Sequence, residues 1–357
     1  MKSTTFDKES TTRLPSSNTP LQQGVVYRKN LGSYTVCSEG REILCTLSAA
    51  LRKALGAAPD RRPDLVRSGG PQKKNGRSKL EPNERLRTDP VVVGDRVGFV
   101  ETVDGGQILE IVERENSLSR RSPVPMPSAR PYEQVIAANI DQVIPVFAAA
   151  NPKPKWGMLD RYLVSAEAAG LQALICITKI DLARGQDGSL EEEMEAAVEE
   201  YRRIGYPILL TSSQSGEGLK ELEEALTGRI SVLLGKSGVG KTSLLNAIQP
   251  GLGLRVNAVS RVTGKGMHTT THLEMFPLGT QGAVVDTPGV REFGLWEVYE
   301  EDLALFFPEM RPLVGRCKYG LDCRHDEEPG CAIRRAVVAG DISPLRYQSY
   351  LRLMVEV

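Results

Sequence analysis

The alternation of apolar and polar positions changes character near residue 120. From residue 24 to 119, short runs of β-branched and aromatic residues are separated by turn residues, which is typical of strands. We predict strands at 24–36, 42–47, 96–103 and 106–112. Asp104-Gly105, between the last two, favours a hairpin. Several short strands so close together indicate a small β-barrel, such as an OB-fold, over residues 24–119.

Three stretches around these strands lack a periodic apolar pattern. Residues 1–23 are polar and predict a disordered tail. Residues 52–87 are rich in Arg, Lys, Pro and Gly, and we interpret them as a basic disordered insertion in the barrel. This insertion is either a solvated loop or a loop that binds RNA phosphates. Residues 113–130 contain several prolines and predict the linker to the next domain.

From residue 131 onward, apolar runs of strand length alternate with amphipathic segments of helix length. We predict strands at 141–147, 173–178, 207–211, 229–234, 273–276 and 282–286. The intervening helices are expected at 158–169, 190–203, 218–226 and 242–248. This alternation favours an α/β domain with a parallel sheet, which we place at residues 120–300. Residues 301–357 form a separate C-terminal domain.

A glycine-rich loop follows the strand at 229–234 and precedes the helix at 242–248. Its residues fit the pattern G-x-x-x-x-G-K-[ST] of a phosphate-binding P-loop: Gly235, Lys236, Ser237, Gly238, Val239, Gly240, Lys241 and Thr242. Lys241 would reach the β- and γ-phosphates, Thr242 would bind Mg²⁺, and Ser243 would lie in the first turn of the helix beside the phosphates. The alternative is a glycine-rich turn that matches by chance. The strand–loop–helix context favours nucleotide binding.

Two further motifs follow other predicted strands and indicate guanine. Thr178, Lys179, Ile180 and Asp181 fit [NT]-K-x-D, in which the carboxylate accepts from two guanine N–H groups and the lysine stem covers the base. Adenine has no matching pair of donors, so it would leave a buried carboxylate unsatisfied. Ser212 and Ser213 follow the next strand and could donate a backbone N–H to the guanine carbonyl. Each short match alone could be an ordinary strand end.

A switch motif follows the strand at 282–286. Asp286-Thr-Pro-Gly289 fits D-x-x-G, in which Asp286 would hold Mg²⁺ through water and the Gly289 N–H would contact the γ-phosphate. Together the motifs lie at the carboxyl ends of predicted parallel strands, where α/β proteins bind nucleotides. Their order is unusual, because the guanine elements precede the P-loop. The sequence therefore predicts a circularly permuted GTPase domain.

Four soft ligands lie close together near the C-terminus. Cys317, Cys323, His325 and Cys331 supply the Cys₃His set of a closed, structural zinc site, which leaves no position for a substrate water. Free thiols or one disulfide are the alternative. The surrounding sequence carries a cluster of basic residues. The cluster either binds rRNA phosphates or forms a solvated surface, and its members are Arg311, Arg316, Lys318, Arg324, Arg334 and Arg335.

The β-rich leader, the permuted motifs and the Cys/His segment together resemble the ribosome-small-subunit-dependent GTPase A family, over roughly residues 24 to 350. The resemblance implies an N-terminal OB domain, a permuted GTPase domain and a C-terminal zinc domain. It implies GTP hydrolysis stimulated by the small ribosomal subunit, late in that subunit's maturation, through binding to its rRNA.

The resemblance also identifies a hydrolytic residue. Val290 stands after D-x-x-G, where Ras-like proteins carry the glutamine that orients water. In the family a histidine just before a threonine run is implicated in hydrolysis, and His268 holds that position here. Thr270, among Thr269, Thr270 and Thr271, is expected to complete the Mg²⁺ shell. Thr178 replaces the usual asparagine, which predicts a weaker tie to the P-loop.

Composition adds limits to this interpretation. Lys and Arg total 45 and Asp and Glu total 45, so RNA binding must come from local patches. No apolar run of membrane-spanning length occurs, and we expect a monomeric cytoplasmic protein without a membrane partner. Two other functions remain open at this point. One is a GTP-gated RNA-binding module with incidental hydrolysis, and the other is a small-molecule kinase that uses the P-loop.

Overall fold

A computed structural model describes residues 20–30, 32–55, 90–121, 133–252, 273–287 and 294–357. Residues 1–19 of the predicted tail at 1–23, most of the basic insertion, and the segments that carry His268, Thr270, Gly289 and Val290 lie outside these residues. The prediction of a tail up to residue 23 is wrong at its end, because residues 22 and 23 belong to the first strand of the barrel, Gln22–Asn30. In the described residues no helix is long and apolar enough to cross a membrane.

The N-terminal strands close into a five-stranded barrel. The strands are β1 (Gln22–Asn30), β2 (Ser33–Ser38), β3 (Arg41–Leu47), β4 (Arg96–Thr102) and β5 (Gly105–Ile111). They pair in the order β1-β2-β3-β5-β4, and β4 pairs back to β1, which closes the barrel. The helix α1 (Ala49–Ala54) lies between β3 and β4, at the start of the predicted insertion. Val26, Val36, Phe99 and Ile108 fill the interior. This confirms the predicted OB-like barrel.

Two details of the first domain differ from the sequence prediction. The predicted strand at 24–36 is a hairpin of β1 and β2, because Gly32 has a φ of 75° and turns the chain. The predicted linker at 113–130 is not irregular throughout. It contains β6 (Ser117–Arg121), which pairs antiparallel with β7 (Glu133–Ala138) in a separate two-stranded sheet.

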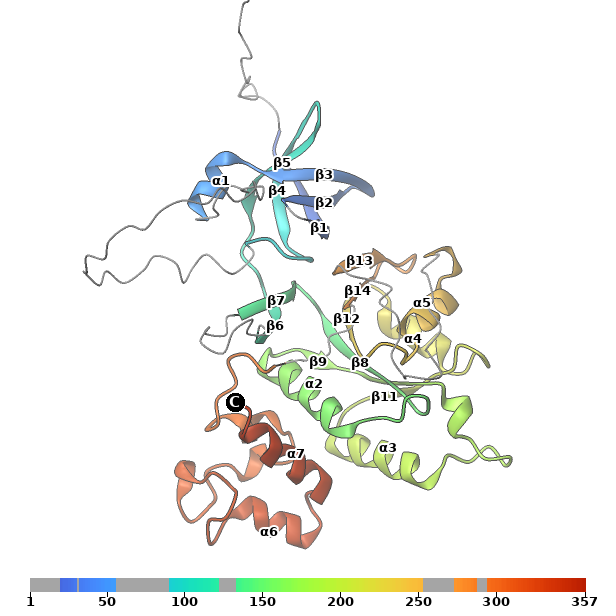
Figure 1. Cartoon of the computed structure of the whole chain (residues 1–357), viewed down its shortest axis with the longest axis vertical. Coiled ribbons are helices and arrows are strands. Elements are labelled where there is room, and N and C mark those ends of the chain that lie inside the picture. Colours follow the sequence, from blue (N-terminus) through green and yellow to red (C-terminus); the bar gives the residue numbers. More distant parts are fainter. Residues whose placement is uncertain (1–19, 31, 56–89, 122–132, 253–272, 288–293) are drawn as a thin grey trace, which may run out of the picture.

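The central domain is a parallel sheet with helices on both faces, as predicted (Figure 1). Its strands are β8 (Gln142–Ala148), β9 (Gln172–Ala173), β10 (Ile175–Thr178), β11 (Ile208–Leu210), β12 (Ile230–Leu234), β13 (Glu274–Pro277) and β14 (Ala283–Asp286). The order is β11-β10-β8-β12-β14-β13, with β9 beside β8 and β13 antiparallel to β14. Long buried runs such as that of β8 are typical of strands covered on both faces.

Four helices cover the two faces of this sheet. They are α2 (Trp156–Ala168), α3 (Glu192–Ile204), α4 (Leu219–Leu226) and α5 (Lys241–Ile248). Leu159 of α2 and Val198 of α3 pack into one core with Val143 and Val232. Residues of α4 and α5, such as Leu222, pack into a second core on the other face with Ile144 and Val284. Alternate strand residues therefore face opposite layers.

The C-terminal residues form a small helical domain that packs against α2. It consists of short 3₁₀ helices, α6 (Ala332–Ala339) and α7 (Pro344–Met354). Its core includes Phe307, Ile333 and Tyr350, together with Val164 of α2. In Figure 1 this domain lies below α2, at the other end of the long axis of the molecule from the barrel.

A buried charged network fastens this C-terminal domain to the central one. Arg346 of α7 donates to Asp160 of α2 at 2.5 Å and to Glu309 at 2.7 Å. Tyr201 of α3 also donates to Asp160, at 2.7 Å. The Arg346 and Asp160 side chains are each only 2% exposed. Burial lowers the pKa of Arg346, but the two carboxylates outweigh this effect and hold the pKa above its ordinary value.

Candidate nucleotide-binding and metal sites

The predicted nucleotide motifs meet at one edge of the central sheet. β10, β8, β12 and β14 are parallel, so their carboxyl ends lie side by side. Thr178 ends β10, the P-loop follows β12, and Asp286 ends β14. The guanine motif, the P-loop and the switch aspartate therefore converge, although they are far apart in the sequence.

The P-loop has the backbone that its glycines permit. Gly238 and Gly240 have φ values of 84° and 101°, a region that residues with side chains rarely adopt. A Cβ on Gly235 would lie 2.5 Å from the carbonyl oxygen of Val146, so a glycine is needed where the loop crosses β8. The helix α5 starts at Lys241 and directs its N-terminal N–H groups toward the loop.

Lys241 and Asp286 form the charged centre of this edge. Lys241 is buried, and its Nζ donates to the Gly235 carbonyl at 2.6 Å. Burial lowers the pKa of Lys241, and the charge of Asp286 opposes this effect. Burial raises the pKa of Asp286, while the charge of Lys241 acts in the opposite direction. Each charge thus stabilises the other in a partly desolvated site.

The same edge offers oxygen atoms of the kind that Mg²⁺ binds. Oδ1 of Asp286 is buried and has no hydrogen-bond partner among the described residues. A buried carboxylate oxygen without a partner is costly, and a bound cation or its water would satisfy it. Thr242, in the first turn of α5, supplies the predicted hydroxyl. These residues fit a magnesium ion bound together with phosphate oxygens.

The guanine motif contacts the P-loop backbone through two side chains, those of Thr178 and Lys179. Thr178 Oγ1 donates to the carbonyl oxygen of Val239 and also lies 3.3 Å from that of Phe147. The threonine hydroxyl therefore contacts the loop backbone directly, and whether this tie is weaker than that of an asparagine stays a prediction. Lys179 Nζ donates to the Gly238 carbonyl at 2.7 Å and to that of Asn151, a residue that the sequence analysis did not identify.

Ser212 positions Asp181 rather than offering its own amide. The Ser212 hydroxyl donates to Asp181 Oδ1 at 2.5 Å, and the amides of Gln214 and Ser215 donate to that hydroxyl at 3.1 Å. The Ser212 N–H donates to the Glu217 carbonyl at 2.9 Å. This leaves Ser213 as the better candidate for the expected backbone donor to guanine. Ile180, the third residue of the motif, is fully buried and anchors the loop.

The Cys/His residues form one compact cluster in the C-terminal domain. The ligand atoms of Cys317, Cys323, His325 and Cys331 lie within 4.8 Å of one another, and all four residues are buried. The His325 Nδ1 atom lies 3.4 Å from Cys317 Sγ and 3.5 Å from Cys331 Sγ. The cysteines are free rather than joined in a disulfide. Three sulfur atoms and one imidazole nitrogen at these separations fit a tetrahedral zinc ion.

The surroundings of the cluster hold its ligands in place. Amides donate to two of the sulfur atoms, from Ala332 to Cys317 at 3.2 Å and from Arg334 to Cys331 at 3.5 Å. Tyr347 donates from its hydroxyl to the backbone carbonyl of His325 at 2.6 Å. Such contacts fix ligand orientation and are typical of structural metal sites.

The predicted basic cluster around this site is only partly available to a ligand. Arg311 donates to Glu167 at 2.6 Å, and Arg324 forms an ion pair with Glu300. Arg316, Lys318, Arg334 and Arg335 are exposed. RNA binding by this surface stays a prediction.

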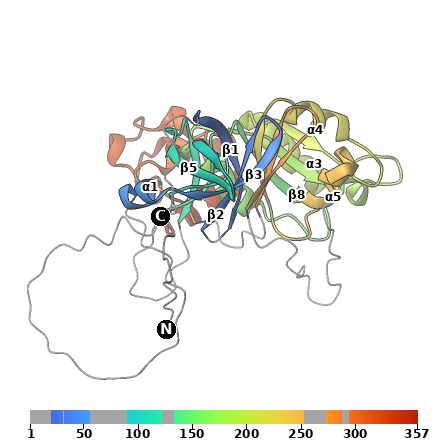
Figure 2. The same ribbon diagram turned by 90° about the horizontal axis from the view of Figure 1, so that it is seen from above.

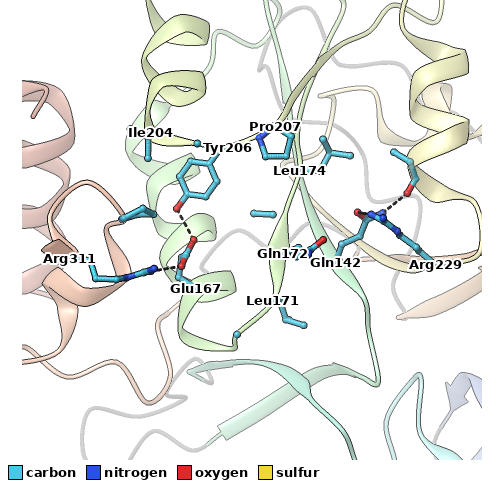
Figure 3. Close-up of a pocket in the computed structure, with 15 residues that line it drawn as sticks. Gln142, Glu167, Leu171, Gln172, Leu174, Ile204, Tyr206, Pro207, Arg229 and Arg311 are labelled. Carbon is cyan, nitrogen blue, oxygen red and sulfur yellow. Dashed lines mark hydrogen bonds and ion pairs between the residues drawn. The ribbon is translucent and has the colours of Figure 1, made fainter. Parts of the chain in front are cut away.

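A cavity of about 860 Å³ opens at the opposite edge of the sheet from these motifs (Figure 3). Its lining includes Leu171, Leu174 and Pro207, near the amino ends of the strands, and Arg311 of the C-terminal domain. Glu167 accepts from Tyr206 at 3.2 Å and from Arg311 at 2.6 Å in its wall. The cavity contains none of the predicted nucleotide-binding residues, so it is separate from the nucleotide site.

Comparison with known proteins agrees with this geometry. The RsgA GTPase family model matches residues 111–296. The small ribosomal subunit biogenesis GTPase RsgA of Gemmatimonas aurantiaca is 46% identical over 285 residues, which cover 79% of this chain and 88% of that protein. RsgA of Bacteroides fragilis is 38% identical and covers 77% and 88%, respectively.

Two solved structures share the whole architecture. YjeQ from Thermotoga maritima has a TM-score of 0.66 at 29% identity, over 94% of this chain and 98% of that one. YloQ, described as a circularly permuted GTPase, has a TM-score of 0.63 at 30% identity, over 96% and 97%. With the converging motifs and the permuted order, these matches show that the chain belongs to the RsgA GTPase family.

Proposed function

We propose that this GTP hydrolase acts in the biogenesis of the small ribosomal subunit, binding the subunit through its rRNA and being stimulated by it. The single observation that carries the proposal is the convergence of Asp181, Lys241 and Asp286 at one sheet edge, within a chain flanked by a barrel and a Cys₃His domain. The names of the RsgA relatives point to the small ribosomal subunit as the assembly involved. A small-molecule kinase would have no use for Asp181 held by Ser212.

The binding residues divide into three groups. Asp181 selects guanine and Lys179 covers the base, while Thr178 fixes both to the P-loop. Residues 235–243 hold the phosphates through backbone N–H groups and Lys241. Thr242 and Asp286, with Thr270, hold Mg²⁺, which neutralises charge on the phosphates when it is bound.

Hydrolysis requires a residue that positions water. Val290 cannot do this, because its side chain neither donates nor accepts a hydrogen bond. His268 is the candidate, since a neutral imidazole can accept a proton from water or orient it. Gly289 would contact the γ-phosphate through its N–H. An incomplete catalytic set explains why the free protein should turn over slowly and depend on the subunit.

The Cys₃His cluster is assigned to one structural Zn²⁺ that shapes an RNA-binding domain. A closed four-ligand set leaves no open position for substrate. The barrel and the C-terminal domain lie at opposite ends of the long axis of the molecule (Figure 1), which suits contact with separate rRNA segments. We propose a monomeric cytoplasmic protein that leaves the subunit after hydrolysis, with domains at 24–119, 120–300 and 301–357.

GTP turnover measured with and without purified small ribosomal subunits tests the proposal. We expect slow turnover alone and at least roughly tenfold faster turnover with small subunits, and no comparable effect of large subunits. Unchanged turnover in the presence of saturating small subunits would leave an RNA-binding module with incidental hydrolysis as the better description.

A further inference from the structure

Three charged side chains lie in register on three neighbouring strands between the barrel and the nucleotide site. Arg28 of β1 is opposite Glu274 of β13, and Glu274 is opposite Asp286 of β14. Residues directly opposite each other in neighbouring strands point to the same face of a sheet. A row of charged side chains on one face of the sheet therefore runs from Arg28 in the barrel, through Glu274, to Asp286, the carboxylate assigned to Mg²⁺. Figures 1 and 2 show β13 passing beside the barrel strands.

The link between the barrel and β13 is narrow. β13 and β14 share four register pairs, whereas β1 and β13 share only one, Arg28 with Glu274. At that pair the Arg28 guanidinium contacts the Glu274 carboxylate, and it also donates to Glu42 within the barrel at 3.1 Å. Tyr27, the neighbour of Arg28, packs against the same core as Met275 of β13. The ion pair thus adds a side-chain contact to the single backbone pairing that joins β1 and β13.

Besides joining the two strands, the ion pair neutralises the charge of Glu274. Glu274 and Asp286 are like charges directly opposite each other, an arrangement that destabilises a strand pair unless each charge is neutralised. Lys241 faces Asp286, and Arg28 neutralises Glu274. Displacing Arg28 would leave the Glu274 carboxylate without its cation, directly opposite Asp286. The charge balance beside Asp286 therefore includes a residue of the barrel.

We propose that Arg28 is a positioning residue that transmits binding at the barrel to the magnesium side of the nucleotide site through Glu274 and Asp286. The inference rests on the proposed function, because it assigns a path to the stimulation by the small subunit. RNA held by the barrel restrains β1, and the ion pair passes this restraint to β13 and β14. Arg28 touches neither nucleotide nor metal.

The test uses full-length Arg28→Glu, Arg28→Lys and Arg41→Glu proteins. Arg41 is a matched control, because it pairs with Glu101 at 2.9 Å inside the barrel and makes the same change in net charge when it becomes glutamate. GTP turnover is measured over a range of small-subunit concentrations, which separates the maximal stimulated rate from the concentration of half-maximal stimulation. GDP affinity of each variant reports on folding.

We expect Arg28→Glu to reduce the maximal stimulated rate about fivefold or more, because it removes an ion pair and adds a like-charge contact. Arg28→Lys should stay within about twofold of the wild type, because it keeps the charge. Arg41→Glu should change only the half-maximal concentration. A maximal rate for Arg28→Glu that equals that of Arg41→Glu would overturn the inference.

A second variant covers the case in which Arg28→Glu does not fold. Glu274→Gln removes the other half of the pair without a like-charge contact, and a double-mutant cycle of Arg28→Gln with Glu274→Gln measures their coupling in the maximal rate. Non-additive losses support the path, and additive losses contradict it. If the wild type is not stimulated by the subunit, the proposed function fails first, and the two failures are thereby distinguishable.

Discussion

Replacing Arg346 by methionine should destabilise the junction of the C-terminal and central domains. The arginine is 2% exposed and gives three hydrogen bonds of 2.5–3.1 Å to Asp160 and Glu309. Its guanidinium carbon also lies 4.5 Å from the ring centre of Phe307. Methionine fills similar apolar space but leaves two buried carboxylates without a cation. Removing one partner of a buried ion pair costs about 3–5 kcal/mol.

Urea unfolding, monitored by tryptophan fluorescence, measures this loss of stability. Trp156 begins α2, and its ring centre lies 5.9 Å from that of Tyr201, which donates to Asp160. At an m-value of about 2 kcal/mol/M, the midpoint should fall by roughly 2 M. Arg352→Met is the control on the same helix, since Arg352 is exposed, and it should change stability by less than about 0.5 kcal/mol.

Two results would decide whether the unpaired carboxylates cause the loss. Combining Arg346→Met with Asp160→Leu and Glu309→Leu should recover most of the stability, because no unpaired charge remains. A loss below about 1 kcal/mol for Arg346→Met alone would refute the reasoning, since it would mean that water or another cation satisfies Asp160.

Three other outcomes are expected. His268→Ala should reduce subunit-stimulated turnover by roughly 10²–10⁴-fold with near-normal GTP affinity; turnover within a few-fold of the wild type would remove the histidine from the mechanism. Metal analysis should find one Zn²⁺ per chain, and Cys323→Ala should release it and unfold the C-terminal domain while GTP affinity is kept; an ordered, metal-free domain would contradict the zinc assignment. Thr178→Val should weaken GTP binding about fivefold, the value of one lost hydrogen bond to Val239, and unchanged binding would show that this contact is dispensable.

The domain organisation and most secondary-structure elements could be predicted from the sequence, because local residue patterns determine them. Strand and helix periodicity located the barrel and the alternating domain, and the P-loop carried its own strand–loop–helix context. Errors arose where a single residue decides the local path. Gly32 turns a continuous β-like run into a hairpin, and the Ser117–Arg121 strand depends on pairing with β7, which no local signal reveals.

The contacts between domains could not be predicted in the same way. Asp160, Tyr201, Glu309 and Arg346 are separated by long stretches of chain, and each alone resembles a surface residue. Their burial follows from the packing of α7 on α2. The role of Ser212 was also hidden, because the hydroxyl bond to Asp181 becomes visible only when two strand ends are brought together.

The claim that motifs from both sides of the P-loop in the sequence form one GTP site, with Asp181 selecting guanine, is tested most directly by nucleotide affinity. GTP, ATP and xanthosine triphosphate should be titrated into the wild type and into Asp181→Asn. The wild type should bind GTP far more tightly than ATP, and Asp181→Asn should prefer xanthosine triphosphate, because an amide complements the 2-oxo group as the carboxylate complements the guanine N–H groups. Equal affinity of the wild type for ATP and GTP, or an unchanged preference in Asp181→Asn, would contradict the assignment of the site.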